Sequence, residues 1–351
     1  MIKLNLNNQI DIEELLLQHK EKYSMEYMKK RFEEYETEIY DEDLSSEYSG
    51  DLLQKKKDKH SRFIKYLMLK TPDILCGEPM VLQKIIEHVE TNYSDLLYSA
   101  PESNQEPASP LHKGLKKIFS YDNFCKRDKS WGAYALTERL NVKVCPYCNR
   151  QYVHTLKMEN GKMRASLDHF YDKGTYPFLS ISFYNLIPCC HLCNSSLKGR
   201  KRFNINTHLH PYIEGFDQKA SFTVKFKKEV VDFTGILNNN SDVFDIGFRV
   251  EKGKGSNKSY QKAKRNIRDF NLNEIYNLHK DYVAEILLKS VIYNEDFVNS
   301  IYSSYPHLFT GKEEILRLIT SNYVSADELD KRVLAKLTYD IASEFGLIYK
   351  L

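Results

Sequence analysis

The first seventy residues carry a helical pattern of apolar positions. Ile12, Leu15 and Leu16 recur at spacings of three and four among long charged side chains, and the same spacing returns at Phe63, Tyr66 and Leu67. At this period, one face of an α-helix is apolar. The chain from residue 10 to residue 70 is therefore predicted to form an amphipathic helical arm.

The middle of the chain is predicted to change to short strands. A short helix is expected over residues 131–140, and a strand is expected to begin near Tyr152 and Val153. Asn160-Gly161 is a dipeptide that favours hairpin turns. We therefore expect the returning strand to lead into Asp168-His169.

The last third predicts two strands and then helices. Residues 222–227 and 244–250 alternate apolar and polar side chains, which is the period of half-buried strands that extend a small sheet. From Ser259 onward the helical period returns, with a cap region expected at Asn271. The expected apolar face of these helices consists of Tyr276, Val283, Ile286 and Leu287.

A turn-rich stretch marks the first expected boundary. Residues 99–110 (SAPESNQEPASP) combine Ser, Pro and Glu, a composition typical of a linker that buries no core. The predicted fold class is α+β, a mainly helical chain around a small central core. The expected segments are an N-terminal helical region, a linker, a cysteine-bearing core, a small β extension and a C-terminal helical region, over residues 1–100, 101–130, 131–215, 216–258 and 259–351.

The composition indicates where the protein is located and how its cysteines are used. The N-terminus has no apolar leader, and no run approaches the 18 or so uncharged apolar residues of a membrane span, so we expect a soluble, cytoplasmic protein. A short central window holds five of the seven cysteines. Such clustering in a cytosolic chain indicates metal binding rather than a disulfide framework.

Charge matters through its distribution, because the net charge is only +3. Residues 33–51 contain nine acidic side chains and no Lys or Arg, whereas residues 252–268 are basic. A second basic run, which adjoins the cysteine cluster, consists of Lys198, Arg200, Lys201 and Arg202. We expect these four side chains to contact nucleic-acid phosphates, although the alternative for any such run is a solvated surface.

Two Cys-x-x-Cys pairs predict a zinc site. Cys145 and Cys148 form one pair, Cys190 and Cys193 form the other, and each pair has the spacing at which two thiolates reach one tetrahedral ion. A redox role for a single pair is the alternative, but redox motifs do not occur in duplicate around an acidic-histidine pair. Cys189 is then expected to be a small buried side chain, and His191 a packing or solvent-facing residue.

Polar residues between and after these pairs suggest hydrolytic chemistry. Asp168 and His169 stand at the end of the predicted strand, and Asn194 follows the last cysteine. Asp168 and Asn194 offer oxygen ligands for Mg²⁺ or Mn²⁺, and His169 can take a proton from water. Phosphodiester hydrolysis needs both an activated water and a cation that neutralises the phosphate.

The same residues carry a family resemblance. CPYCN at residues 145–149, SLDHFYDKGTYP at 166–177 and NLIPCCHLCNSSLKG at 185–199 resemble the HNH endonucleases with four cysteine zinc ligands. The resemblance implies a strand pair, a loop and a helix around one catalytic ion. It also implies that His169 is the general base, that Asp168 and Asn194 bind the ion, that Asn185 orients the base, and that the four cysteines bind structural zinc.

A narrower likeness concerns biological context. The wider phrase around Tyr176-Pro177 and His210-Pro211-Tyr212 resembles nuclease subunits of Septu-type bacterial anti-phage systems, which work with an ATPase partner. This resemblance implies an antiviral nuclease with DNA rather than RNA as substrate, and a partner that docks on the helical regions outside the core. Two alternatives are a zinc-bearing nucleic-acid-binding module without catalysis and a complex-assembly subunit with a vestigial core.

Overall fold

The computed structural model describes residues 1–4, 11–39, 50–97, 110–127, 130–158, 161–217, 219–229, 232–237, 243–250 and 258–348. Its α-helices are α1 (Ile12–Lys22), α2 (Met25–Ile39), α4 (Gly50–Leu69), α5 (Thr71–Cys76), α6 (Pro79–Leu97), α7 (Pro110–Ile118), α8 (Tyr121–Phe124), α9 (Ala133–Leu140), α10 (Phe233–Leu237), α11 (Lys258–Asp269), α12 (Leu272–Tyr276), α13 (Lys280–Ile292), α14 (Glu295–Ser304), α15 (Lys312–Thr320) and α16 (Ala335–Glu344). Its strands are β1 (Leu156–Met158), β2 (Gly161–Met163), β3 (Ser166–His169), β4 (Leu186–Cys189), β5 (Ala220–Phe226) and β6 (Phe244–Val250).

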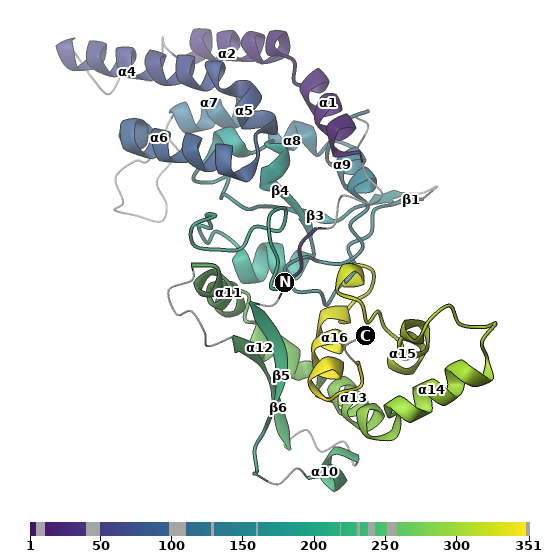
Figure 1. Ribbon diagram of the computed structural model, residues 1–351. Coiled ribbons are helices and arrows are strands. Elements are labelled where there is room, and N and C mark those ends of the chain that lie inside the picture. Colours follow the sequence, from purple (N-terminus) through teal and green to yellow (C-terminus); the bar gives the residue numbers. More distant parts are fainter. Residues whose placement is uncertain are drawn as a thin grey trace.

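The N-terminal helices gather on one side of the molecule, at the top of Figure 1. Asp11 caps α1, since its side chain accepts a hydrogen bond from the Glu14 backbone N–H at 3.0 Å. Leu15 and His19, four residues apart, are the buried positions of this helix. α1 contacts α5, and α2 contacts α4 and α7. The expected helices over residues 10–70 are therefore present, although part of the acidic run, residues 40–49, lies outside the described residues.

Three antiparallel pairs of strands follow in chain order. The expected hairpin at residue 161 is present as β1 and β2, and Asn160 itself lies outside the described residues. The expectation that its returning strand runs on into Asp168-His169 was wrong. β3 is a separate strand that pairs with β4, with Asp168 opposite Ile187 and His169 opposite Leu186. β4 leads directly into a π-helix, η3 (Leu192–Lys198), so the centre of the molecule is a strand pair followed by a helix.

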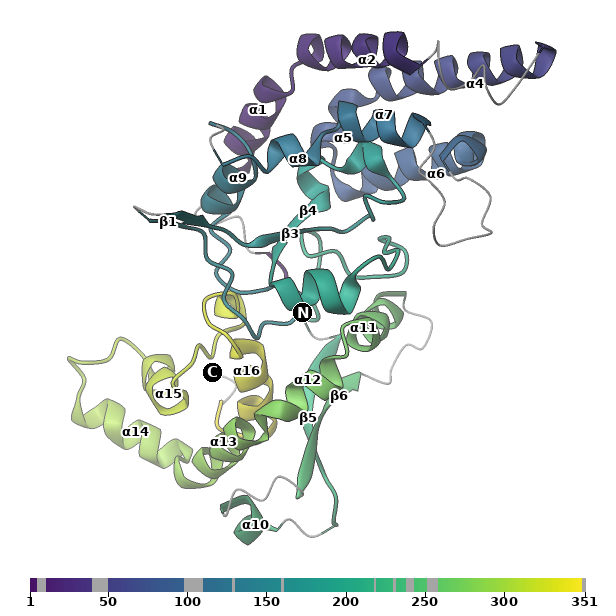
Figure 2. The same ribbon diagram turned by 180° about the vertical axis from the view of Figure 1, so that it is seen from behind.

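The other side of the molecule holds the long hairpin of β5 and β6 and the C-terminal helices, as Figures 1 and 2 both show. Phe222 pairs with Phe248 in this hairpin, which forms a sheet of its own. α16 packs against β5, and α13 packs against α16. Asn271 precedes α12 as expected, but it adopts a left-handed φ of 46° and its side chain makes no cap hydrogen bond.

The N-terminal helices hold the loop between β3 and β4. The Tyr171 hydroxyl donates to the Pro79 carbonyl at 3.0 Å, and His19 Nε2 lies 2.9 Å from the Ile181 carbonyl. The Ser182 hydroxyl donates to the Ile74 carbonyl. These bonds tie α1, α5 and the start of α6 to residues 171–185, so the helical layer fixes the shape of that loop.

The predicted fold class is confirmed: the protein is mainly helical α+β, with small two-stranded sheets and a buried cluster of four cysteines. Within the described ranges, no helix has the length and apolar character that crossing a membrane requires. The turn-rich stretch at residues 99–110 lies almost entirely outside the described residues. The described remainder of the segment predicted as linker and lead-in, 101–130, contains the helices α7 and α8.

Candidate functional site

The four predicted zinc ligands meet in one buried cluster. Cys145 and Cys148 lie on the loop after α9, where an isolated antiparallel bridge between Val144 and Tyr152 closes a tight turn. Cys190 and Cys193 lie at the junction of β4 and η3. Backbone N–H groups point at the sulfurs, Arg150 N at 3.4 Å from Cys148 Sγ and Cys193 N at 3.5 Å from Cys190 Sγ.

The geometry of the cluster fits a zinc ion. The four sulfurs all lie within 4.8 Å of one another, and Cys148 Sγ is 3.9 Å from Cys190 Sγ. A tetrahedral zinc with Zn–S bonds of about 2.3 Å places its sulfurs roughly 3.8 Å apart, whereas a disulfide would require about 2.05 Å. Burial raises the pKa of the Cys145 thiol, whereas hydrogen bonds from the neighbouring thiols lower that of Cys190. Four thiolates at this spacing need a cation, so the cluster can bind structural Zn²⁺.

The first cysteine pair also anchors distant parts of the chain. The Ile2 backbone N–H donates to the Pro146 carbonyl at 2.8 Å, which ties the N-terminus to the turn. Asn149 accepts from the Leu334 backbone N–H at 2.7 Å, and its side chain accepts from Lys336 N at 3.0 Å and donates to the Leu329 carbonyl. The cysteine cluster therefore lies where the N-terminal segment, the core and α16 meet.

Asp168 is buried on β3, and both of its carboxylate oxygens have protein partners. The Tyr147 hydroxyl donates to Oδ2 at 2.6 Å, and Lys198 Nζ lies 3.0 Å from Oδ1. Tyr147 stands between the first two cysteines, and burial raises its pKa, so it remains a donor. Its ring stacks on Phe270 at 4.6 Å. The turn that carries Cys145 and Cys148 thus positions the Asp168 carboxylate through Tyr147.

His169, the next residue, is held by a backbone carbonyl. Its Nε2 lies 2.9 Å from the Ser180 carbonyl, and because a carbonyl only accepts, Nε2 carries the hydrogen and Nδ1 the lone pair. Burial, reinforced by the nearby Lys173, lowers the pKa of His169 to about 3. The ring is therefore neutral at physiological pH, and Tyr121 packs edge-on against it at 4.6 Å.

Asn185 holds the loop that carries this carbonyl. Its Oδ1 accepts from the Tyr171 backbone N–H at 2.7 Å, and its Nδ2 donates to the carbonyls of Tyr171 at 3.1 Å and Leu179 at 3.0 Å. Leu179 directly precedes Ser180. Asn185 is fully buried and fixes both ends of the loop between the histidine and its carbonyl partner.

Asn194 lies in η3, which contacts β3. Its carbonyl accepts from the Gly199 backbone N–H at 3.0 Å, the five-residue spacing of a π-helix, a conformation often found at functional sites. The side chain is half-buried, and it makes no hydrogen bond to the described part of the chain. Its amide oxygen therefore remains available to a ligand.

The predicted basic cluster divides into two parts. Lys198 differs from the other three residues: its side chain is 1% exposed, and its ammonium pairs with Asp168 instead of lying at the surface. The following residues Arg200, Lys201 and Arg202 are exposed. Lys201 Nζ donates to the Asp269 carbonyl at 2.7 Å, which joins this segment to the end of the basic helix α11. The exposed basic residues of α11 are Lys258, Lys264, Arg265 and Arg268.

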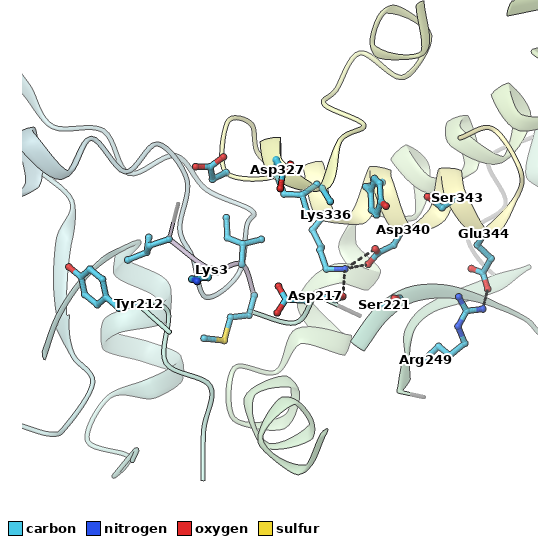
Figure 3. Close-up of a pocket in the computed structure, with 17 residues that line it drawn as sticks. Lys3, Tyr212, Asp217, Ser221, Arg249, Asp327, Lys336, Asp340, Ser343 and Glu344 are labelled. Carbon is cyan, nitrogen blue, oxygen red and sulfur yellow. Dashed lines mark hydrogen bonds and ion pairs between the residues drawn. The ribbon is translucent and has the colours of Figure 1, made fainter. Parts of the chain in front are cut away.

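Cys189 is fully buried and His191 is exposed, both as expected. The sequence pattern did not predict a role for Tyr147, although this residue lies between two predicted zinc ligands. Nor did it predict a cavity of about 750 Å³ between the N-terminal segment and α16 (Figure 3). There Lys336 pairs with Asp340 at 2.7 Å and Arg249 with Glu344 at 3.4 Å, and none of the predicted site residues lines it.

Comparisons of the chain with protein-family models, with curated proteins and with solved structures find no significant match.

Proposed function

We propose that the protein is a metal-dependent endonuclease of the HNH type, which hydrolyses phosphodiester bonds in nucleic acid. The observation that carries the proposal is the setting of His169. It ends the first strand of a strand pair that leads into a helix, and its Nε2 donates to the Ser180 carbonyl. Asn185 binds the carbonyl of the preceding residue, Leu179. The donation from Nε2 leaves the lone pair of the ring on Nδ1, the atom that would accept a proton from water in general-base catalysis.

The oxygen atoms of Asp168 and Asn194 suit a hard cation. Asp168 and Asn194 would hold Mg²⁺ or Mn²⁺ through oxygen, the preferred ligand atom of these ions. Such an ion neutralises charge on the scissile phosphate and on the leaving oxygen. Asn194 offers its amide oxygen, whereas Asp168 is shared with Tyr147 and Lys198. The separate four-thiolate cluster would hold zinc as a structural ion.

Nucleic acid, DNA rather than RNA, is the proposed substrate. The exposed side chains of Arg200, Lys201 and Arg202 continue onto the basic helix α11 through the contact of Lys201 with Asp269. The basic side chains of these two adjoining segments would contact the phosphates of the nucleic acid. A bacterial anti-phage role in the cytoplasm with an ATPase partner rests on the resemblance alone. Co-purification with the neighbouring gene product tests it.

A non-catalytic zinc-dependent nucleic-acid-binding or assembly subunit is the second candidate. One observation favours it: Asp168 is buried, and both of its oxygens already bind protein groups. In that case the Asp168–Lys198 ion pair would only stabilise the folded core, and no divalent cation would bind.

The deciding experiment is nicking of supercoiled DNA by the purified zinc-loaded protein in Mg²⁺ or Mn²⁺. We expect His169→Ala to lower the rate by about 10²- to 10⁴-fold, because a general base contributes that much, while zinc content and DNA binding stay unchanged. His191→Ala is the matched control, an exposed histidine in the same core that should cleave normally.

Metal titration distinguishes the metal ligands from the general base. Excess Mn²⁺ should partly rescue weakened ligands such as Asp168→Asn or Asn194→Ala, but it cannot replace the base. Cleavage by His169→Ala at the wild-type rate would exclude the proposed mechanism, and absence of any metal-dependent cleavage by the wild type would favour the second candidate.

A further inference from the structure

Lys198 is the last residue of η3 and one of the least exposed lysines in the described part of the chain. Its Nζ lies 2.6 Å from the His169 carbonyl and 3.0 Å from Asp168 Oδ1, and its ammonium stands 5.2 Å from the centre of the Phe203 ring. Lysine is almost never fully buried without a partner. This ammonium is therefore the resident counter-ion of Asp168.

The local backbone explains how the ammonium reaches the strand. The bond from Gly199 N to the Asn194 carbonyl gives η3 its wide π turn, and Gly199 then adopts a φ of +53°. Glycine occupies that left-handed conformation without strain, so the chain leaves the helix directly after Lys198. The side chain of Lys198 consequently lies over β3 rather than in solvent with Arg200.

The position of Lys198 creates a conflict for a divalent cation. With Asp168 Oδ2 bound by Tyr147 and Oδ1 paired with Lys198, an incoming cation meets a neutralised carboxylate and a neighbouring positive charge. Charges that close together repel strongly away from bulk water. An anionic phosphate beside η3 would offer the ammonium another partner and would relieve that repulsion.

We propose that Lys198 couples the two binding events: it holds Asp168 until the substrate phosphate takes over its ammonium, so the divalent cation and nucleic acid bind cooperatively. The inference rests on the proposed function, because it takes Asp168 as a cation ligand. Binding linkage is reciprocal, so the factor by which nucleic acid tightens the cation equals the factor by which the cation tightens nucleic acid.

The test measures Mn²⁺ affinity by titration calorimetry and not by cleavage. Zinc-loaded His169→Ala protein keeps the proposed cation ligands and leaves the oligonucleotide intact. Mn²⁺ is titrated into this protein with and without a duplex oligonucleotide, and the titration of the duplex alone is subtracted. We expect at least tenfold tighter Mn²⁺ binding in the presence of the duplex.

The added substitution Lys198→Met should raise Mn²⁺ affinity at least tenfold without DNA and reduce the coupling to less than threefold. Lys143→Met is the matched control, because it removes an equal charge from an exposed residue of the same core and should change neither value. Lys198→Arg, which retains the charge, should keep most of the coupling.

Equal Mn²⁺ affinity with and without DNA in the protein that retains Lys198 overturns the inference, whether or not Lys198→Met folds. Unchanged Mn²⁺ affinity in folded Lys198→Met also overturns it. Either result leaves the nuclease proposal standing if the wild type cleaves DNA and Asp168→Asn weakens Mn²⁺ binding. Absence of any Asp168-dependent Mn²⁺ binding would reject both.

Discussion

Replacement by alanine should have different effects at two asparagines of the same core, one on stability and the other on cleavage. Asn185 is fully buried and makes three hydrogen bonds to backbone groups, whereas the half-buried side chain of Asn194 makes none among the described residues. Asn185→Ala should therefore destabilise the fold, and Asn194→Ala should remove cleavage with the fold intact.

The magnitude for Asn185→Ala follows from which groups are left without a partner. Within the described residues, the N–H and carbonyl of Tyr171 bond to Asn185 alone, whereas the Leu179 carbonyl keeps a bond from Ser182 N at 3.2 Å. Each buried backbone group left unsatisfied costs about 1–3 kcal/mol, and removal of the third bond adds about 1 kcal/mol. The expected loss is about 3–7 kcal/mol, against about 0.5 kcal/mol for Asn194→Ala.

Urea unfolding followed by circular dichroism, at pH 7.5 with zinc present, measures both values. Zinc content is checked for each variant, because the loss of zinc would destabilise the protein by another route. If Asn185→Ala costs under about 1 kcal/mol, or if the two variants are equally destabilised, the assignment of Asn185 as the residue that holds the loop is refuted.

Three further outcomes are expected. Cys193→Ser should lose its zinc and melt at much lower temperature, because structural zinc contributes about 10–16 kcal/mol to such sites, while Cys189→Ala, outside the cluster, should retain about one zinc per chain by elemental analysis. Arg200→Ala with Arg202→Ala should weaken DNA binding regardless of sequence and flatten its salt dependence by about one unit for each phosphate that the protein no longer neutralises; an unchanged slope would show that the cluster is only a solvated surface. Burial lowers the pKa of His19 to about 4 and that of His210 to about 3, so both rings are neutral in the folded protein. The stability that the two neutral rings contribute is complete above about pH 6.5 and is lost as the pH falls toward those pKa values. Urea midpoints should report a loss of about 3 kcal/mol between pH 7.5 and pH 5.5 at constant zinc content, and a flat profile would contradict the buried neutral state of these rings.

The sequence alone determined the features that depend on residues close together in the chain. Helices over residues 10–70 and 259–348 follow from a period of three to four residues, which places apolar side chains on one face whatever the partner. The two Cys-x-x-Cys pairs predicted a shared cluster, because four thiols at that spacing in one chain have few other uses, and the four sulfurs do converge.

Only the tertiary structure decided which distant groups meet at the candidate site. The alternation of a strand does not identify its partner, so the sequence could not show that β3 pairs with β4 rather than with β1. The Ser180 carbonyl, the Tyr147 hydroxyl and the Lys198 ammonium reach His169 and Asp168 through the fold of the loop and of η3. Lys198 and Arg200 look alike in the sequence, yet one is buried and the other exposed. Burial of a charge depends on whether a counter-ion lies within reach of its side chain, and the three-dimensional fold brings that counter-ion from a distant part of the sequence.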